Sequence, residues 1–446
     1  MAPTHRDLEP RDEIAVVGSG IAGLTCAFLL GQRHRVTIYE LQPTLGMDAH
    51  AVSVVQGATT TRVDVPMRVF FDVYYPLLAR LYAHLGIETE EVNYSASFSS
   101  LAGELFFQYD NYRFERYRIP FLTWSGLTHP VAWRIGADAI RFFGRLSRDL
   151  AAEELRDLTL EQYLRTRGLS TAFWEQFLLP AYAGICTCSY ESLRRYPART
   201  ILGYLGSGLL TAGVRRVRDG AQRIVERLAA NAEDVRCGTA VAEIRRNDTG
   251  VELTDARGEA RTFDHVVLAT QANHSLRILA DASSNEREML SAFRYESSTV
   301  LLHTDPRLAP RQRAWWAPVN FLLRDGSRAP MATILLNPVH RSLAREPTLF
   351  QTWNPLIEPD ASQVLSESTF ERPVVDGASL DALERLTTLH DETERRVWFC
   401  GAYAAPGIPL LESAALSGAR VAEKLACGLP WAGTKPARDR RHGGVR

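Results

Sequence analysis

The chain has 446 residues, of which 46% are hydrophobic and 23% charged, a balance typical of a folded globular protein and not of a disordered or collagen-like chain. Basic and acidic residues number 51 and 52, whereas a nucleic-acid-binding protein usually has a basic excess. Six cysteines without a CxxC pair disfavour a disulfide scaffold or a zinc ribbon, and no apolar run reaches the ~18 residues of a membrane span. The polar N-terminus lacks an apolar signal core, so we expect a cytoplasmic protein. We also expect no metal site.

Lysine is almost absent from this sequence. Lys424 and Lys435 are its only lysines, and both lie near the C-terminus. Chemistry through a buried Schiff-base lysine, including that of pyridoxal phosphate, is therefore disfavoured. A P-loop is excluded, because no lysine follows a suitable glycine-rich loop.

The strongest motif lies at the start of the chain. The apolar run EIAVV predicts a buried parallel strand, GSGIAG at 18–23 follows it, and then comes a helical stretch. Gly18 permits a tight turn, Gly20 lets the backbone approach a pyrophosphate, and Gly23 lets the helix pack closely on the sheet. The helix N-terminus offers N–H groups to phosphates, and the strand HRVTIYE ends at Glu40, which is placed to bind a ribose. Together these features predict a dinucleotide site.

Two further signatures lie far along the chain. VAEIRR, VELTD and ARTFD predict a small antiparallel meander, and the buried strand HVVLAT follows it and ends at Thr270. VWFCGAY predicts a strand that breaks at Gly401, before a helix of small residues over 412–426. The nucleotide domain must therefore be discontinuous. We predict an α/β protein with a dinucleotide domain over 12–75, 231–275 and 395–430, an α+β substrate domain over 76–230 and 276–394, and a disordered tail over 431–446.

These motifs give the chain a resemblance to flavoproteins of the amine oxidase and phytoene desaturase superfamily, and within it to NAD/FAD-binding, amine-oxidoreductase-like proteins. The resemblance covers nearly the whole chain and includes IAVVGSGIAGLTCAFLL, RVDVPMRVFFDVYYPLLARLYAHLGIETE, LTLEQYLRTRGLS, FDHVVLATQANHSLRIL and WFCGAYAAPGIPLLESAALSG. It implies a Rossmann-type FAD-binding domain of the glutathione-reductase type and a discontinuous α+β substrate domain. It also implies noncovalent FAD, because no Cys or His has a family-matched position for a covalent linkage.

The resemblance also assigns cofactor contacts. Glu40 would bind the adenosine ribose, Val241 would meet the adenine, and Gly401 and Ala402 would meet the ribityl-phosphate region. The helix that opens near Leu410 would face the flavin pyrimidine ring, where its dipole stabilises negative charge on the reduced flavin. The complete set of expected cofactor residues is Gly18, Ser19, Gly20, Ile21, Ala22, Gly23, Glu40, Leu41, Gly46, Met47, Pro66, Met67, Arg68, Val241, Thr270, Gly401, Ala402, Leu410 and Leu411.

The sequence departs from the family pattern in two places. The second motif of the family usually has paired glycines near the flavin, whereas here Gly46 is followed by Met47, whose side chain would lie beside the cofactor. Amine oxidases commonly hold a water near the flavin N5 atom with a lysine, and no lysine is available here. The second departure argues against oxygen-dependent amine oxidation.

Arg68 is the leading catalytic candidate, because it lies in the apolar, flavin-facing stretch of the family. It would balance an anionic flavin or bind a substrate carboxylate, unless it forms a structural ion pair with Asp64 or Asp72. His50 is a candidate base, and Asp48 has similar standing, against a structural role for each.

Four other side chains are predicted to be structural. Tyr74 and Tyr75 could line a pocket in front of the flavin, but aromatic core packing is favoured for both. Cys186 and Cys188 are spaced too closely for the usual zinc knuckle and are expected to be buried.

Residues 123–150 predict an amphipathic helix. Its expected apolar face and its arginines are Trp133, Ile135, Ile140, Phe142, Phe143 and Leu146, and Arg134, Arg141, Arg145 and Arg148. Such a helix covers a pocket or makes peripheral contact with a membrane surface, or it is a domain helix with one face on the core. Either of the first two roles would favour a lipid-like substrate.

The sequence thus predicts an FAD-dependent oxidoreductase that transfers hydride from a small hydrophobic substrate, of lipid or isoprenoid type, to flavin N5. Oxygen, a quinone or the product itself would then take the electrons. The alternatives are a flavin amine oxidase, an isomerase without net oxidation, and a non-catalytic dinucleotide-binding protein.

Overall fold

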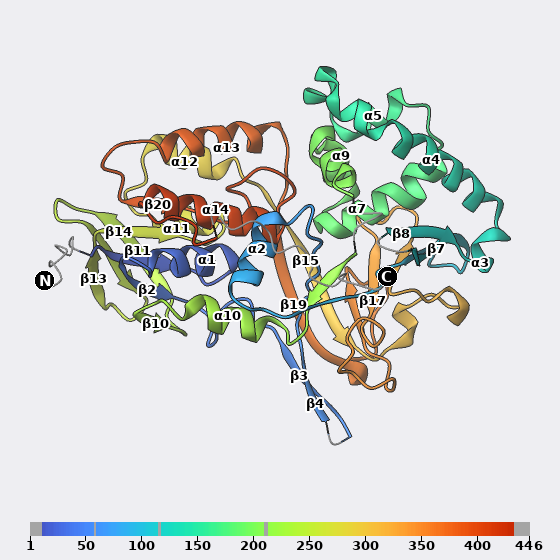
Figure 1. Ribbon diagram of the computed structural model, residues 1–446, viewed down its shortest axis with the longest axis horizontal. Helices are drawn as coiled ribbons and strands as arrows, with labels where there is room; N and C mark the ends of the chain where they lie inside the picture. Colours follow the sequence, from blue (N-terminus) through green and yellow to red (C-terminus); the bar gives the residue numbers. More distant parts are fainter. Residues whose placement is uncertain (1–10, 58, 115–116, 209–212, 432–446) are drawn as a thin grey trace, which may run out of the picture.

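The computed structural model describes residues 11–57, 59–114, 117–208 and 213–431. Two lobes lie side by side, the first around a parallel sheet and the second around a larger mixed sheet (Figure 1). Where they meet lie α2 (Pro76–His84), β15 (Tyr295–His303) and β19 (Val364–Pro373).

The first lobe contains a five-stranded sheet in which every neighbouring pair is parallel. Its strands, in spatial order, are β10 (Asp234–Arg236), β2 (Arg35–Tyr39), β1 (Glu13–Val17), β14 (His265–Leu268) and β20 (Val397–Phe399). The central strands are almost wholly apolar because both faces of the sheet are covered.

The two faces of this sheet pack on different elements. Ile14 and Val16 belong to the core with the first group of helices, whereas Ala15 and Val17 belong to the core with the second group and the meander. The first group is α1 (Ile21–Leu30), α10 (Ala221–Ala229) and α14 (Leu411–Lys424), and the second is α11 (Ala272–Ile278), α12 (Ser284–Ser291) and α13 (Gly377–Leu389). The meander is β11 (Val241–Arg246), β12 (Val251–Asp255) and β13 (Ala260–Phe263).

The strands predicted for the first lobe are present, with small differences at their ends. The second strand ends at Tyr39, so Glu40 lies just beyond it. The last strand was predicted over VWFCGAY, but β20 ends at Phe399, and Gly401 lies in the following turn. All three predicted segments of the dinucleotide domain contribute strands to this one sheet.

The second lobe contains an eight-stranded sheet, antiparallel except where β6 and β16 pair in parallel. The order is β19, β15, β18 (Phe350–Trp353), β17 (Met331–Leu335), β16 (Val319–Leu323), β6 (Ala96–Ser100), β7 (Leu105–Phe114) and β8 (Tyr117–Leu122). Beside it lie α3 (Trp124–Leu127), α4 (Pro130–Ala151), α5 (Leu160–Thr166), α6 (Thr171–Phe173), α7 (Leu179–Cys186), α8 (Tyr190–Arg195) and α9 (Ala198–Gly206). Two small pairs complete the fold, β3 (Val52–Gln56) with β4 (Thr59–Val63), and β5 (Thr89–Glu91) with β9 (Arg215–Val217).

The predicted helix over 123–150 consists of the short α3 and the long α4. Its apolar face was predicted as one surface, and the structure divides it. Ile135, Phe142 and Leu146 are buried, whereas Trp133 and Ile140 are exposed. Trp133 and Ile140 therefore do not pack on the core.

Other expectations concern cysteines, metals and the tail. Cys186 and Cys188 are buried and free, as predicted. Within the described residues there is no group of three or more side chains that could hold a metal ion, and no helix is long and apolar enough to cross a membrane. Of the predicted tail, only Trp431 is described, and it is buried with its ring 5.5 Å from that of His84. Residues 432–446 lie outside the described part of the chain.

Candidate functional site

The glycine-rich turn between β1 and α1 has the geometry that its three glycines predict. A Cβ atom at Gly18, where φ is +100°, would lie 2.8 Å from the carbonyl oxygen of Ala269, and one at Gly23 would lie 2.0 Å from that of Gly18. A Cβ atom at Gly20 would instead meet nothing within 4 Å. Gly18 and Gly23 are thus needed for packing, whereas Gly20 leaves space open in front of the turn.

The N-terminus of α1 faces this turn. Its first intrahelical hydrogen bond runs from the Leu24 N–H to the Gly20 carbonyl at 2.9 Å, so the preceding amides project out of the helix end. The first turn holds no acidic residue that would neutralise them. This end of α1 is consequently suited to an anionic group such as a phosphate.

Glu40 is buried beside the turn, and its carboxylate joins the turn to the loop after β2. It accepts hydrogen bonds from the Ser19 N–H at 3.0 Å, from the Ser19 hydroxyl, and from the Gln42 N–H at 2.8 Å. The Gly46 N–H donates to Ser19 Oγ at 2.7 Å and so holds the next predicted cofactor segment against the turn. Leu41, the neighbour of Glu40 in sequence, is exposed.

Helices α1 and α14 run parallel and in close contact. A Cβ atom at Gly418 would lie 2.2 Å from the carbonyl oxygen of Ala22, and at the other end Arg33 donates to the carbonyl of Ala426 at 2.7 Å. Because Gly418 lies opposite the first turn of α1, the seven residues before it carry the N-terminus of α14 about 10 Å farther along the same direction. The two helix N-termini therefore point into one region at two successive positions.

The segment of Pro66, Met67 and Arg68 is held on the far side of this region. The Met67 N–H donates to Gln351 Oε1 at 2.7 Å, and Gln351 Nε2 donates to the Asp64 carbonyl at 3.1 Å. These two bonds fix the segment against β18 of the second sheet.

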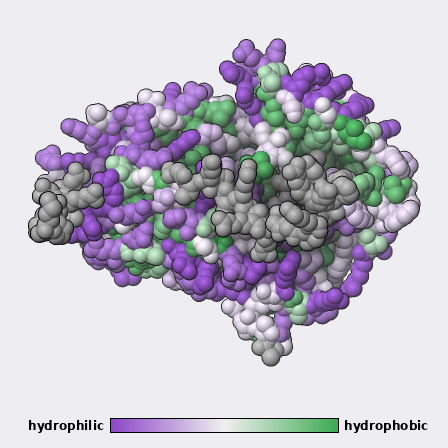
Figure 2. Space-filling model, in the orientation of Figure 1, coloured by the Kyte–Doolittle hydropathy of each residue, from purple (hydrophilic) through white to green (hydrophobic). Residues whose placement is uncertain are grey.

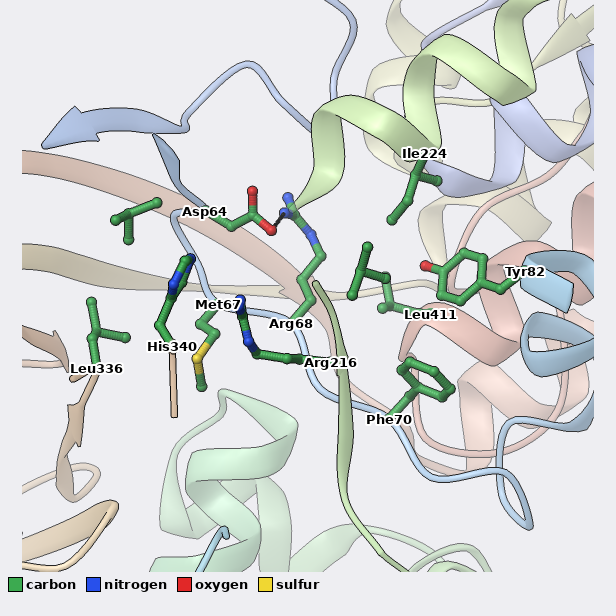
Figure 3. Close-up of a pocket in the computed structure, with 12 residues that line it drawn as sticks. Asp64, Met67, Arg68, Phe70, Tyr82, Arg216, Ile224, Leu336, His340 and Leu411 are labelled. Carbon is green, nitrogen blue, oxygen red and sulfur yellow. Dashed lines mark ion pairs between the residues drawn. The ribbon is translucent and has the colours of Figure 1, made fainter. Parts of the chain in front are cut away.

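Arg68 points toward Asp64, as Figure 3 shows, but the pair is loose, with 3.8 Å between Nη1 and Oδ2. Asp64 also accepts a hydrogen bond from the Ala221 N–H at 3.0 Å, and Arg68 Nη1 is a buried nitrogen without a hydrogen-bond partner among the described residues. A small cavity of about 20 Å³ lies beside it, large enough for a water molecule. The ion pair with Asp64 is thus present, but it leaves Nη1 of Arg68 without a hydrogen bond among the described residues.

His50 and Asp48 have different surroundings. Asp48 forms a two-pronged ion pair with Arg62, through Nε at 2.8 Å and Nη2 at 2.7 Å, which joins its loop to β4. The His50 ring packs edge-on against Phe370, and its Nδ1 lies 3.4 Å from Ser368 Oγ. Burial and the charge of Arg68 lower the pKa of His50, so it is neutral near pH 7.

A cavity of about 510 Å³ occupies the second lobe and reaches the region just described. Its lining includes Pro66, Met67, Arg68, Leu410 and Leu411, the residues that the sequence predicts to face the flavin. Aromatic and aliphatic side chains line most of the remainder, among them Tyr94, Phe98, Tyr109, Phe143, Phe177, Tyr182, Phe321, Ile334 and Trp353. Segments far apart in the sequence thus open onto one apolar space.

Arg372 lines the same cavity, and sequence reasoning missed it. Its Nη1 donates to the Pro409 carbonyl at 3.4 Å, and no ion pair joins it to a carboxylate in the described part of the chain. Burial and the nearby charge of Arg68 lower the pKa of the Arg372 guanidinium. Arg216, by contrast, is neutralised by Glu90 at 2.8 Å. Arg372 lies in β19, whose mostly polar sequence VLSESTFERP carries no signal for a buried site.

Two tyrosines follow Arg68 in the chain. Tyr75 lines the cavity beside Arg372, and burial raises the pKa of its hydroxyl well above the usual value. The Tyr74 hydroxyl accepts a hydrogen bond from the Ile408 N–H at 3.0 Å. Tyr74 therefore fixes the turn before α14, as a structural residue would, while Tyr75 faces the cavity.

Comparison with known proteins gives one family and several solved structures. The family model for flavin-containing amine oxidoreductases matches residues 21–332. No curated protein sequence matches the chain. A fatty acid isomerase from P. acnes that produces CLA has a TM-score of 0.63 at 15% identity, over 93% of this chain and 98% of that chain.

Two other solved structures have the same fold. Putrescine oxidase bound to putrescine has a TM-score of 0.61 at 13% identity, over 94% of this chain and 99% of that one. A putative protoporphyrinogen oxidase from Exiguobacterium sp. 255-15 has a TM-score of 0.60 at 16% identity, over 93% and 99%. At these identities the similarity shows the fold and not the substrate.

Proposed function

The chain belongs to the family of flavin-containing amine oxidoreductases, and from this premise we propose that it binds FAD noncovalently and oxidises an apolar substrate held in the 510 Å³ cavity. The first lobe would be a Rossmann-type domain of the glutathione-reductase kind, built from segments 12–75, 231–275 and 395–430. Segments 76–230 and 276–394 would hold the substrate. The observation that carries the proposal is the apolar cavity that ends at the predicted flavin-facing residues.

The residues of the first lobe fit FAD. The open space at Gly20 and the end of α1 suit the pyrophosphate, and Glu40 stands at the end of β2 where a ribose would lie. The N-terminus of α14, about 10 Å farther on, would face the flavin ring. Gly18–Gly23, Gly401 and the other residues that the resemblance assigns would complete the contacts.

Bound FAD would supply a hydride acceptor at flavin N5. The chain itself contributes position and charge. The cavity walls would hold the reacting C–H bond against the flavin-facing segment and exclude water. The dipole of α14, with Arg68 and Arg372, would stabilise the negative charge that reduction creates.

The charges at this end of the cavity favour a neutral or anionic substrate over an amine. Arg68 and Arg372 would repel an ammonium group, and the one carboxylate among the described lining residues is Glu91, on β5. The one lysine in the described part of the chain, Lys424, lies at the C-terminal end of α14 and pairs with Asp391. A fatty acid isomerase, a putative protoporphyrinogen oxidase and a putrescine oxidase all share the fold, so the choice between these substrate classes rests on the charges that line the cavity.

The open cavity also bears on the non-catalytic alternative. A protein that only binds a dinucleotide needs no second space beside it, and side chains would fill such a space. Here the cavity of about 510 Å³ remains open in the second lobe and reaches Met67, Arg68 and Leu411. It is large enough for a small organic molecule, which favours turnover.

Three ligands of equal chain length test the substrate class. We would titrate the FAD-loaded chain with decanol, decanoate and decylamine under nitrogen and follow the flavin absorption bands. We expect decanol and decanoate to shift these bands and decylamine to leave them unchanged. Shifts or bleaching with decylamine alone would overturn the assignment in favour of an amine oxidase.

A variant that fills the cavity locates the binding. Ala181 lies on α7 and lines the cavity, so Ala181→Phe should weaken decanol binding roughly tenfold by occupying its space, without loss of FAD. Ala83→Phe, at an exposed position of α2, is the matched control and should bind decanol normally. Equal binding by all three proteins would show that the ligand lies elsewhere.

A further inference from the structure

Large apolar side chains are exposed together at one edge of the second lobe. They are Tyr112 at 59%, Phe121 at 53%, Trp124 at 88%, Trp133 at 58% and Ile140 at 77% exposure. They come from β7, β8, α3 and α4, which are neighbouring elements, and the rings of Tyr112 and Phe121 touch edge-on at 5.7 Å. Figure 2 shows hydrophobic surface over α4 and toward α3. Isolated exposed apolar residues are common, but a cluster of this size marks an interaction surface.

Helix α4 shows that this exposure is systematic. Trp133, Ala137, Ile140 and Gly144 are all exposed and fall at helical spacing on one stripe. The stripe of Ile135, Phe142 and Leu146 packs on the core on another side of the helix. A helix that only covered the core would need one apolar stripe, so the second stripe requires a partner of its own.

The charges of α4 define that partner. Four arginines are exposed along the helix, Arg134, Arg141, Arg145 and Arg148. The two acids of α4 are buried instead: Asp138 accepts from the Ser170 N–H at 2.9 Å and pairs with Arg141 at 3.3 Å, and Asp149 accepts from the Tyr163 hydroxyl at 2.8 Å. The exposed face of α4 therefore combines apolar and cationic side chains without a carboxylate. This combination suits an apolar phase beneath a negatively charged surface.

The same elements form a wall of the cavity. Phe143 of α4 and Tyr109 and Asn111 of β7 line it. On β7 these two residues point to the opposite face from the exposed Tyr112, and on α4 Phe143 lies beside the exposed stripe. Trp133 is fixed by a hydrogen bond from its Nε1 to the Leu127 carbonyl at 3.0 Å, which joins α4 to α3. The exposed edge and the substrate cavity are thus two sides of one structural unit.

We propose that this edge, which we call the docking edge and define as Tyr112, Phe121, Trp124 and the exposed residues of α4 from Trp133 to Arg148, binds the surface of an anionic lipid bilayer. Tryptophans and Ile140 would enter the interfacial layer, and the arginines would contact lipid phosphates. The docked protein takes its substrate from the bilayer, a step that rests on the proposed function, whereas docking itself does not.

Vesicle sedimentation tests the docking edge with the full chain. We would use vesicles of equimolar phosphatidylcholine and phosphatidylglycerol, and vesicles of phosphatidylcholine alone. We expect the wild-type chain to sediment with the anionic vesicles and to bind neutral vesicles roughly tenfold more weakly. A wild-type chain that stays in the supernatant with both vesicle types overturns the proposal.

Two sets of variants separate the apolar from the charged contribution. The triple variant Trp124→Ser, Trp133→Ser, Ile140→Ser should lose binding to both vesicle types. The variant Arg134→Gln, Arg145→Gln, Arg148→Gln should lose only the preference for anionic vesicles. Retention of wild-type binding by both would overturn the proposal.

The control removes exposed apolar side chains elsewhere. Val55 and Leu365 are 70% and 46% exposed on β3 and β19, and Val55→Ser with Leu365→Ser should bind vesicles like the wild type. Equal melting temperatures show that all variants fold. If light scattering finds a wild-type dimer that the triple variant breaks, the edge joins two copies and the bilayer is the wrong partner. A chain that docks but takes up no FAD would contradict the proposed function and leave docking intact.

Discussion

The two lobes encode their sites in different ways. In the first lobe, three glycines and one acid within 23 residues of sequence shape the turn that we propose holds the nucleotide, and they act through backbone atoms around that turn. In the second lobe, the cavity is lined by side chains of helices, strands and loops that are spread along the sequence from Pro66 to Leu411. The difference teaches that a backbone-governed site tolerates almost no local change, whereas a cavity made of many side chains is altered only by degrees.

The largest expected effect comes from Gly20, because its Cβ would enter the cradle without touching protein. Gly20→Val should therefore fold normally but weaken FAD binding by roughly two orders of magnitude. Isothermal titration of the flavin-free chain with FAD measures this. Gly144→Val, in open space on α4, is the control and should bind FAD like the wild type. Normal FAD affinity in Gly20→Val would show that the cradle holds no phosphate.

A substitution at Gly418 tests the packing of the first lobe rather than its binding of FAD. Its Cβ would lie 2.2 Å from the Ala22 carbonyl, so Gly418→Ala must push α14 away from α1. We expect a loss of about 2–3 kcal/mol in the free energy of unfolding, measured with urea. An unchanged midpoint would contradict the close helix contact.

Acid should weaken both lobes through histidines that are shielded from water, among them His303 in the second lobe and the partly buried His390 in the first. Backbone N–H groups donate to ring nitrogens of both, from Asp305 to His303 and from Phe399 to His390, so both rings are neutral when folded. Burial lowers the pKa from 6.5 to about 4 for His303 and to about 3 for His390. Unfolding thus takes up protons, and stability present above pH 6.5 is lost as the pH falls toward these values.

Each histidine contributes about 1.4 kcal/mol per pH unit within its own window. Urea midpoints between pH 7 and pH 4 measure the slope, and His303→Gln should reduce the slope while lowering stability at pH 7. The control His84→Gln, at an exposed site, should leave the slope unchanged. A flat profile in the wild type would mean that these rings are not neutral and buried.

The smallest effect is expected at His50, which faces Ser368 and Phe370 and does not line the cavity. His50→Gln should change the rate of flavin reduction by less than about twofold, since the side chain is no proton acceptor for the substrate. Stopped-flow absorption with any ligand that bleaches the flavin measures it. A fall of a hundredfold or more would restore His50 as the base.

The same difference between the two lobes explains which parts of the fold and the site are predictable from the sequence. The turn at 18–23, Glu40 and the strands of the first sheet are predictable because each follows from local backbone demands. The roles of Arg372 and Phe321 are not predictable, because no pattern near them in the sequence indicates that β19 and β16 enclose a cavity. On α4 the period placed Trp133 and Ile140 correctly on the helix, but only packing shows that they lie on a second stripe away from the core.

The most direct test of the account is the absorption spectrum of the purified chain before and after acid precipitation. We expect flavin bands in the native protein that move wholly into the supernatant, as noncovalent FAD requires. A colourless chain that takes up no added FAD, or flavin that stays with the precipitate, would contradict it.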